Sequence, residues 1–149
     1  MDCYCVEIDR QITLVEFVSA FYTTNLFKIE RAILGLVLSR GASDEDAERL
    51  GRGVSESFAV WKVEDRTSNQ ILLKELTGRT KSWLMVSPTH DASNPNSRLY
   101  FGSALMPKRQ AEANTRRMGA AFHSLLWFHK LYSQALLASA ARKITLADL

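Results

Sequence analysis

The histidine with the most favourable setting for chemistry is His129, in an apolar segment near the end of the chain. Leu125 and Tyr132 lie on the same helical stripe, about one turn before and one turn after it. A neutral imidazole buried there needs a hydrogen-bond partner, since burial without one costs about 1–3 kcal/mol. His129 is therefore a candidate general acid or base, or a group that orients the polar head of a ligand. The alternative, which we favour, is a hydrogen-bonded histidine of the core or of an interface.

Metal chemistry needs more ligands than this sequence places together. His123 precedes His129 by six positions, which puts the two imidazoles on different faces of a helix. Cys3 and Cys5 leave the same face of a predicted strand, but two thiolates make only half of a tetrahedral site. We therefore predict no metal site and no cofactor, and a structural or incidental role for the two cysteines.

The remaining polar motifs do not specify a reaction. His90 and Asp91 could form an acid–base pair at an end of the sheet, although such neighbours are common in exposed loops. Four basic residues, which could attract a phosphate or carboxylate group, stand in the first half of the predicted C-terminal helix: Lys108, Arg109, Arg116 and Arg117. No phosphate-binding loop, nucleophile elbow or base-stacking pattern accompanies them. The sequence favours a protein without a catalytic role and without a nucleic-acid partner.

The composition is that of a globular protein. The chain has 149 residues, of which 46% are hydrophobic and 23% charged, and its net charge is +3. This length fits a single domain spanning 1–149. The polar start MDCYCVEIDR does not match a signal peptide, and charges interrupt every apolar stretch before it could span a membrane. We expect a cytoplasmic location.

A long helix is predicted over 107–143. An apolar stripe recurs every three or four residues: Met118, Phe122, Leu125, His129, Tyr132 and Leu136. Trp127 falls on the polar edge of this helix, where its indole would be exposed unless a second subunit or another element covers it. Trp127 therefore suggests a homodimer formed through the C-terminal helix.

Two helices are predicted between the first strand, 4–8, and the second. Thr13 and Glu16 have the spacing of a capping box, so a helix should begin there and continue towards a cap at Gly41. The poor helix formers at 23–25 predict a kink or a break within it. Ser43 opens the next helix, which ends at Gly51 or Gly53.

Extended structure follows from residue 57. Four segments rich in aromatic and β-branched residues are predicted strands: 57–65, 70–76, 80–88 and 98–105. The short turns between the first three predict sequential antiparallel pairing. The expected fold is α+β, with an antiparallel sheet of about five strands packed on the long C-terminal helix.

The segments RLYFGSALMP (98–107) and FHKLYSQALL (128–137) are similar to segments of uncharacterised bacterial families, and the element order resembles the helix-grip architecture of the START-like superfamily. That resemblance implies a small hydrophobic or amphipathic ligand held between the sheet and the C-terminal helix. About five strands instead of about seven indicate a reduced version or a different α+β fold. The residues expected to line the pocket are Trp61, Trp83, Tyr100, Phe122, Leu125, His129 and Tyr132.

Two considerations limit the prediction of a ligand pocket. Tyr100 and Phe101 must lie on opposite faces of their strand, so at most one of them points into a pocket. All the lining residues could also pack as ordinary core, which is the interpretation we favour. The sequence thus leaves two hypotheses: a small-molecule binding protein, or a non-catalytic interaction module that acts as a homodimer.

Overall fold

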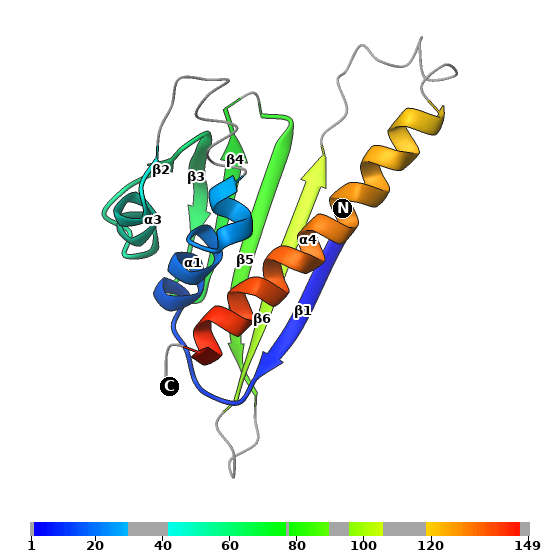
Figure 1. Cartoon of the computed structure of the whole chain (residues 1–149). Helices are drawn as coiled ribbons and strands as arrows, with labels where there is room; N and C mark the ends of the chain where they lie inside the picture. Colours follow the sequence, from blue (N-terminus) through cyan, green and yellow to red (C-terminus); the bar gives the residue numbers. More distant parts are fainter. Residues whose placement is uncertain (1, 30–41, 77, 90–95, 106–118, 147–149) are drawn as a thin grey trace.

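The computed structural model describes residues 2–29, 42–76, 78–89, 96–105 and 119–146, and at 105 and 119–129 it describes the backbone alone. The fold is α+β: one antiparallel sheet packs against a long C-terminal helix (Figure 1). The predicted fold class is therefore confirmed.

The described residues form six strands in the order β1-β6-β5-β4-β3-β2, and all neighbours are antiparallel. Their bounds are β1 Asp2–Ile8, β2 Ser57–Phe58, β3 Trp61–Arg66, β4 Gln70–Glu75, β5 Thr80–Pro88 and β6 Ser97–Leu105. The predicted count of about five was one too low, because the segment expected at 57–65 is divided into β2 and β3. Ala59 adopts a φ of 52° at the division, a conformation that cannot continue a strand.

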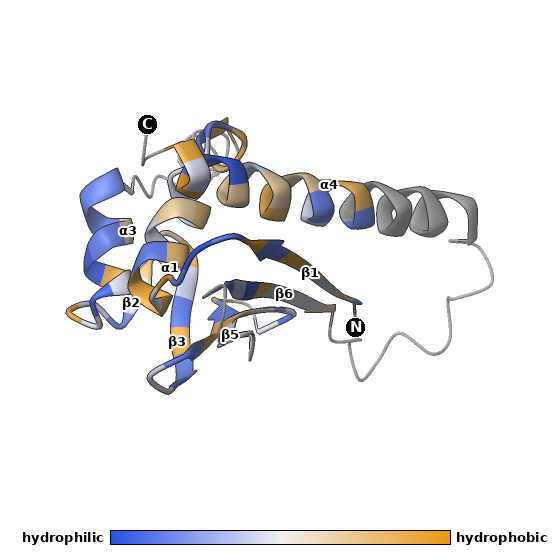
Figure 2. Cartoon of the chain, turned by 90° about the horizontal axis from the view of Figure 1, so that it is seen from below, coloured by the Kyte–Doolittle hydropathy of each residue, from blue (hydrophilic) through white to orange (hydrophobic). Residues whose placement is uncertain are grey.

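Three labelled helices lie on one side of the curved sheet (Figure 2). They are α1 Leu14–Tyr22, α3 Asp44–Gly51 and α4 Gly119–Leu146. Thr13 and Glu16 form the predicted capping box, and Ser43 caps α3. The predicted helix over 107–143 corresponds to α4, which runs to Leu146, while 107–118 lie outside the described residues.

The predicted break after α1 is also present. The Thr23 hydroxyl donates a hydrogen bond to the Ser19 carbonyl oxygen at 2.6 Å, and α1 ends there. Thr24 then caps a new helical segment at 25–29 by accepting a hydrogen bond from the Phe27 backbone N–H at 3.2 Å. The predicted cap at Gly41 lies outside the described residues.

An aromatic cluster fills the space where α1 and α4 meet the sheet. The ring of Phe21 on α1 lies 4.8 Å from that of Phe101 on β6, and the ring of Tyr22 lies 5.2 Å from that of Phe58 on β2. The apolar face of α4 closes this core with Leu136, Leu137, Ala140, Ala141 and Ile144. The core thereby fixes α1 and the last turns of α4 against each other.

Candidate functional site

Three of the residues predicted to line a pocket belong to the part of α4 for which only the backbone is described: Phe122, Leu125 and His129. The side chain of Trp127 is outside the description for the same reason. The roles proposed for His129 and for Trp127 therefore stay predictions. The loop pair His90–Asp91 and the basic residues at 108–117 lie outside the described residues as well.

Two further residues predicted to line the pocket lie between the sheet and the helices. Trp61 on β3 and Tyr132 on α4 are both partly buried and pack against the core. The indole Nε1 of Trp61 is buried and meets no hydrogen-bond acceptor among the described residues. An unused buried donor is uncommon, so this N–H could serve a polar ligand group or a water molecule.

Trp83 and Tyr100 lie on the other face of the sheet, which corrects their expected place in the pocket. Their strand neighbours Leu84 and Phe101 are buried against the helices, and alternation turns Trp83 and Tyr100 outward. Tyr100 and Phe101 lie on opposite faces of β6, as predicted, and Phe101 is the one that faces the helices. Neither Trp83 nor Tyr100 can line a space between the sheet and α4.

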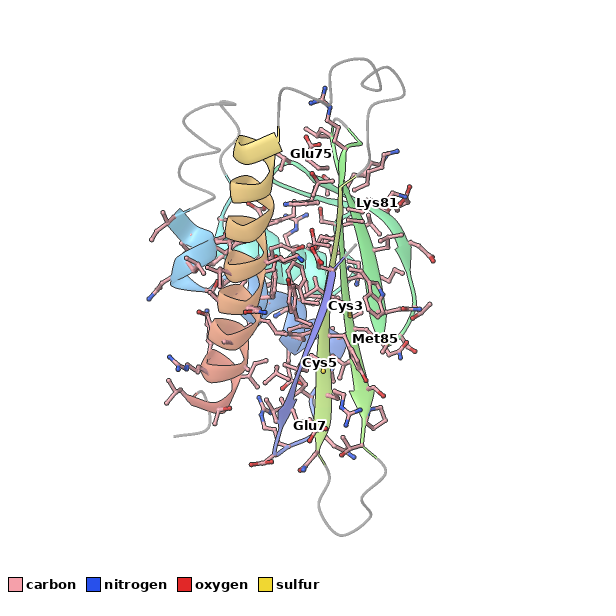
Figure 3. All side chains as sticks on the ribbon, turned by 90° about the vertical axis from the view of Figure 1, so that its right-hand side faces the viewer. Cys3, Cys5, Glu7, Glu75, Lys81 and Met85 are labelled. Atoms are coloured by element: carbon pink, nitrogen blue, oxygen red, sulfur yellow. The ribbon has the colours of Figure 1, made fainter. Side chains whose placement is uncertain are left out.

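The outer face of the sheet carries its own cluster. The Trp83 indole donates a hydrogen bond to Oε1 of Gln70 at 2.9 Å, and its ring lies 6.2 Å from that of Tyr100. Gly102, opposite Trp83 in the sheet, leaves room for the indole, because a Cβ there would lie 3.0 Å from the ring. Among the described residues, no helix covers this face (Figures 2 and 3).

The two cysteines extend this face on β1. Cys3 and Cys5 are exposed free thiols, and Figure 3 shows them with Met85 on the side of the sheet away from α4. Burial, with an added contribution from the neighbouring Cys5, raises the pKa of the Cys3 thiol. Cys3 is therefore protonated at neutral pH and is a poor nucleophile. Across the described ranges, no three His, Cys, Asp or Glu side chains are grouped closely enough to hold a metal ion.

The described residues form an open cleft of about 570 Å³ between the end of α1, the segment 25–29 and the last turns of α4. Three cationic side chains line it: Lys28, Arg142 and Lys143. Its other lining residues are three hydroxyl residues, one amide and two leucines, namely Thr23, Thr24, Ser139, Asn25, Leu26 and Leu146. The cleft thus combines positive charge, hydrogen-bonding groups and apolar surface.

Contacts across the cleft hold two of its cations in place. Lys143 Nζ donates hydrogen bonds to the Thr23 carbonyl oxygen at 3.0 Å and to the Thr23 hydroxyl. Lys28 Nζ lies 2.5 Å from a carboxylate oxygen of Asp44 on α3. Burial, together with the nearby positive charge of Lys28, lowers the pKa of Lys143, while Asp44 opposes the shift. An anion between these cations would relieve their repulsion.

Arg142 differs from the two lysines because none of the described residues pairs with it. Its side chain is exposed and forms no hydrogen bond or ion pair with any described residue. A guanidinium group presents several donors that match a carboxylate or phosphate group in a bidentate geometry. Arg142 is therefore the cation of the cleft that is available to a ligand.

The sequence did not reveal this cleft. The break at Thr23–Thr24 and the basic pair Arg142–Lys143 are each visible, but about 120 residues separate them along the chain. The basic pair ends a helix, a position where a cation also interacts favourably with the helix dipole and needs no ligand to explain it. Only the packing of α4 beside α1 brings the break and the basic pair together in space.

Comparison of the chain with protein-family models, curated proteins and solved structures gave no significant match. The resemblance to the START-like superfamily therefore remains a prediction from the sequence. In the described part of the chain, no helix has the length and apolar character needed to cross a bilayer.

Proposed function

We propose that the protein binds a small amphipathic anion, with the anionic head in the cleft between α1 and the end of α4. The observation that carries this proposal is the convergence of Lys28, Arg142 and Lys143 on one cleft of about 570 Å³. A volume of this size is in the range of small-molecule sites. With Asp44 pairing one of the three cations, the local charge remains positive.

The polar lining supports an oxygen-rich head group. Arg142 can form two parallel hydrogen bonds to a carboxylate or phosphate, and the hydroxyl group of Ser139 can donate another. Lys143 is held by Thr23 and so is already oriented before a ligand arrives. Groups fixed in advance lose less conformational entropy on binding.

Two leucines support an apolar tail on the same ligand. Leu146 has 64% of its surface exposed, and Leu26 is partly buried. Covering such apolar surface contributes about 25 cal/mol per Å² removed from water. A short alkyl chain beside the head group would cover both side chains, so the proposed ligand is an amphipathic anion instead of a bare inorganic one.

Thermal shift with four compounds tests this proposal: octanoate, octyl phosphate, octanol and inorganic phosphate. We expect the two alkyl anions to raise the melting temperature most, since a ligand at about 100 times its Kd adds about 2.7 kcal/mol of stability. The effect should weaken as the pH rises through the lowered pKa of Lys143, because the amine then loses its charge.

A matched pair of variants locates the site. Arg142→Gln removes the cation of the cleft that is available to a ligand, and it should abolish most of the rise in melting temperature produced by octanoate. Lys130→Gln removes an exposed cation of the same helix, outside the cleft, and should leave the shift unchanged. Equal losses in the two variants, or an equal response to octanol and octanoate, would contradict the proposal.

A further inference from the structure

The two edges of the sheet are different. The edge at β2 is a strand of two residues that contacts α3, so it offers little backbone to a partner. The edge at β1 is seven residues long and pairs with β6 without interruption, from Asp2 opposite Ser103 to Ile8 opposite Ser97. Figure 3 looks onto this edge, with α4 to one side of it.

The outer edge of β1 is a template for another strand. Alternate residues of an edge strand direct their N–H and C=O groups away from the sheet, and among the described residues no strand pairs with β1 on that side. The sequence of β1, DCYCVEI, has no lysine, no proline and no bulge, three features that often protect an edge from pairing. Its two charged residues, Asp2 and Glu7, stand near the ends of the strand, and each is paired with a cation of the same copy.

We propose that a second copy of this chain pairs with β1, antiparallel and centred on Cys5, so that two six-stranded sheets become continuous. In an antiparallel pair, opposed residues point to the same side, so inner residues of one copy must oppose inner residues of the other. Pairing centred on Cys5 meets this condition and uses all seven residues of the strand. It places Tyr4 opposite Val6 of the second copy, and both are partly buried inner residues with surface left to cover.

Charge also fits a second copy. In this register Glu7 lies opposite Cys3, and Asp2 lies opposite Ile8, so no like charges meet across the interface. Within each copy, Arg98 already pairs with Glu7, and Lys130 lies 3.7 Å from Asp2. The acidic groups of the two strands are therefore neutralised before they approach each other.

The two thiols report the register directly. Cys5 would face Cys5 of the second copy with Cα atoms about 4.5–5.5 Å apart, a separation that a disulfide can bridge. Cys3 would lie about 13 Å along the strands from Cys3 of the second copy, because two residues on either side of the centre separate them. Both thiols are exposed on the same face of the same strand, so a colliding chain can reach either of them. Oxidation at alkaline pH offsets the raised pKa of Cys3, so that the register and not the thiol reactivity decides which variant is cross-linked.

The test oxidises two single-cysteine variants with diamide, which takes up the two electrons and two protons released by a pair of thiols. Cys3→Ser, which keeps Cys5, should give a covalent dimer, and Cys5→Ser, which keeps Cys3, should remain monomeric on a non-reducing gel. Equal cross-linking of the two variants, or cross-linking of Cys5→Ser alone, would overturn the proposal.

A second measurement needs no oxidation. Cys5→Lys places two introduced lysines opposite each other and should weaken the dimer about fivefold in light scattering, whereas Cys3→Lys places its lysine opposite Glu7 and should preserve it. Circular dichroism of both variants checks that the fold is retained. A wild-type chain that is monomeric at every concentration would refute self-pairing of β1.

Discussion

The two faces of the sheet carry similar large apolar residues, but these residues are buried to different extents. On the inner face, Leu84 and Phe101 are paired neighbours that are at most 5% exposed, beneath the rings of α1. On the outer face, Trp83 and Tyr100 are only partly buried and have no helix of the described chain above them. Large apolar side chains therefore do not by themselves mark the interior of this protein. Their position relative to the helices decides whether they stabilise the core or form a surface.

The largest expected difference between the faces comes from two consecutive residues of β5. Leu84→Ala should lower the free energy of unfolding by about 2–5 kcal/mol, because a fully buried side chain leaves a cavity. Trp83→Ala removes a larger side chain, yet it should cost only roughly 1–2 kcal/mol, because the partly buried indole has no helix of the described chain above it and leaves no enclosed cavity. Urea denaturation of both variants measures the difference.

If Trp83→Ala costs as much as Leu84→Ala, the outer face is covered in solution, and the contrast between the faces is wrong. Self-association followed in the same samples would show whether a second copy supplies that cover.

A smaller effect is expected at Gly102, beneath the Trp83 indole. A Cβ at this position would lie 3.0 Å from the indole Cε3, so Gly102→Ala should cost about 1 kcal/mol through overpacking. The cost should largely disappear in a Trp83→Ala background, since the two positions share one contact. A double-mutant cycle by urea denaturation tests this coupling, and independent, additive costs would show that the indole does not pack on Gly102.

The smallest effect is expected at the capping box that begins α1, the helix that covers the inner face. Thr13→Ala should cost roughly 0.5–1 kcal/mol at neutral pH. Burial tends to raise the pKa of Glu16, but hydrogen bonds from Thr13 and the pairing with Arg10 outweigh it, so the pKa is lowered. The stabilisation is thus complete above the ordinary pKa of Glu16 and is lost as the pH falls through the lowered one.

Comparison of the two proteins by thermal denaturation from neutral to acidic pH checks the sign. The difference in stability between the wild type and Thr13→Ala should shrink in acid. A difference that grows as the pH falls would show that Glu16 does not act through the cap.

Local patterns in the sequence predicted most of the elements. Neighbouring residues and short turns were enough to predict the capping box at Thr13, the helix start at Ser43, the break at Thr23–Thr24 and the strands β4 and β5. The division at Ala59 was missed because nothing in the local composition requires its positive φ. Strand alternation correctly separated Tyr100 from Phe101, but it could not say which of them faces the helices.

By itself, the sequence determined the fold class, the caps and the faces that each strand separates, because these follow from periodicity and from short-range hydrogen bonds. Only the tertiary structure decided which face is inside and that Arg142 and Lys143 share a cleft with Thr23 and Lys28. It also decided that β1 pairs with β6 and is the outermost strand of the sheet formed by the described residues. Each of these results depends on contacts between segments that are distant in sequence. Such contacts are set by how the layers pack, and no local pattern in the chain records them.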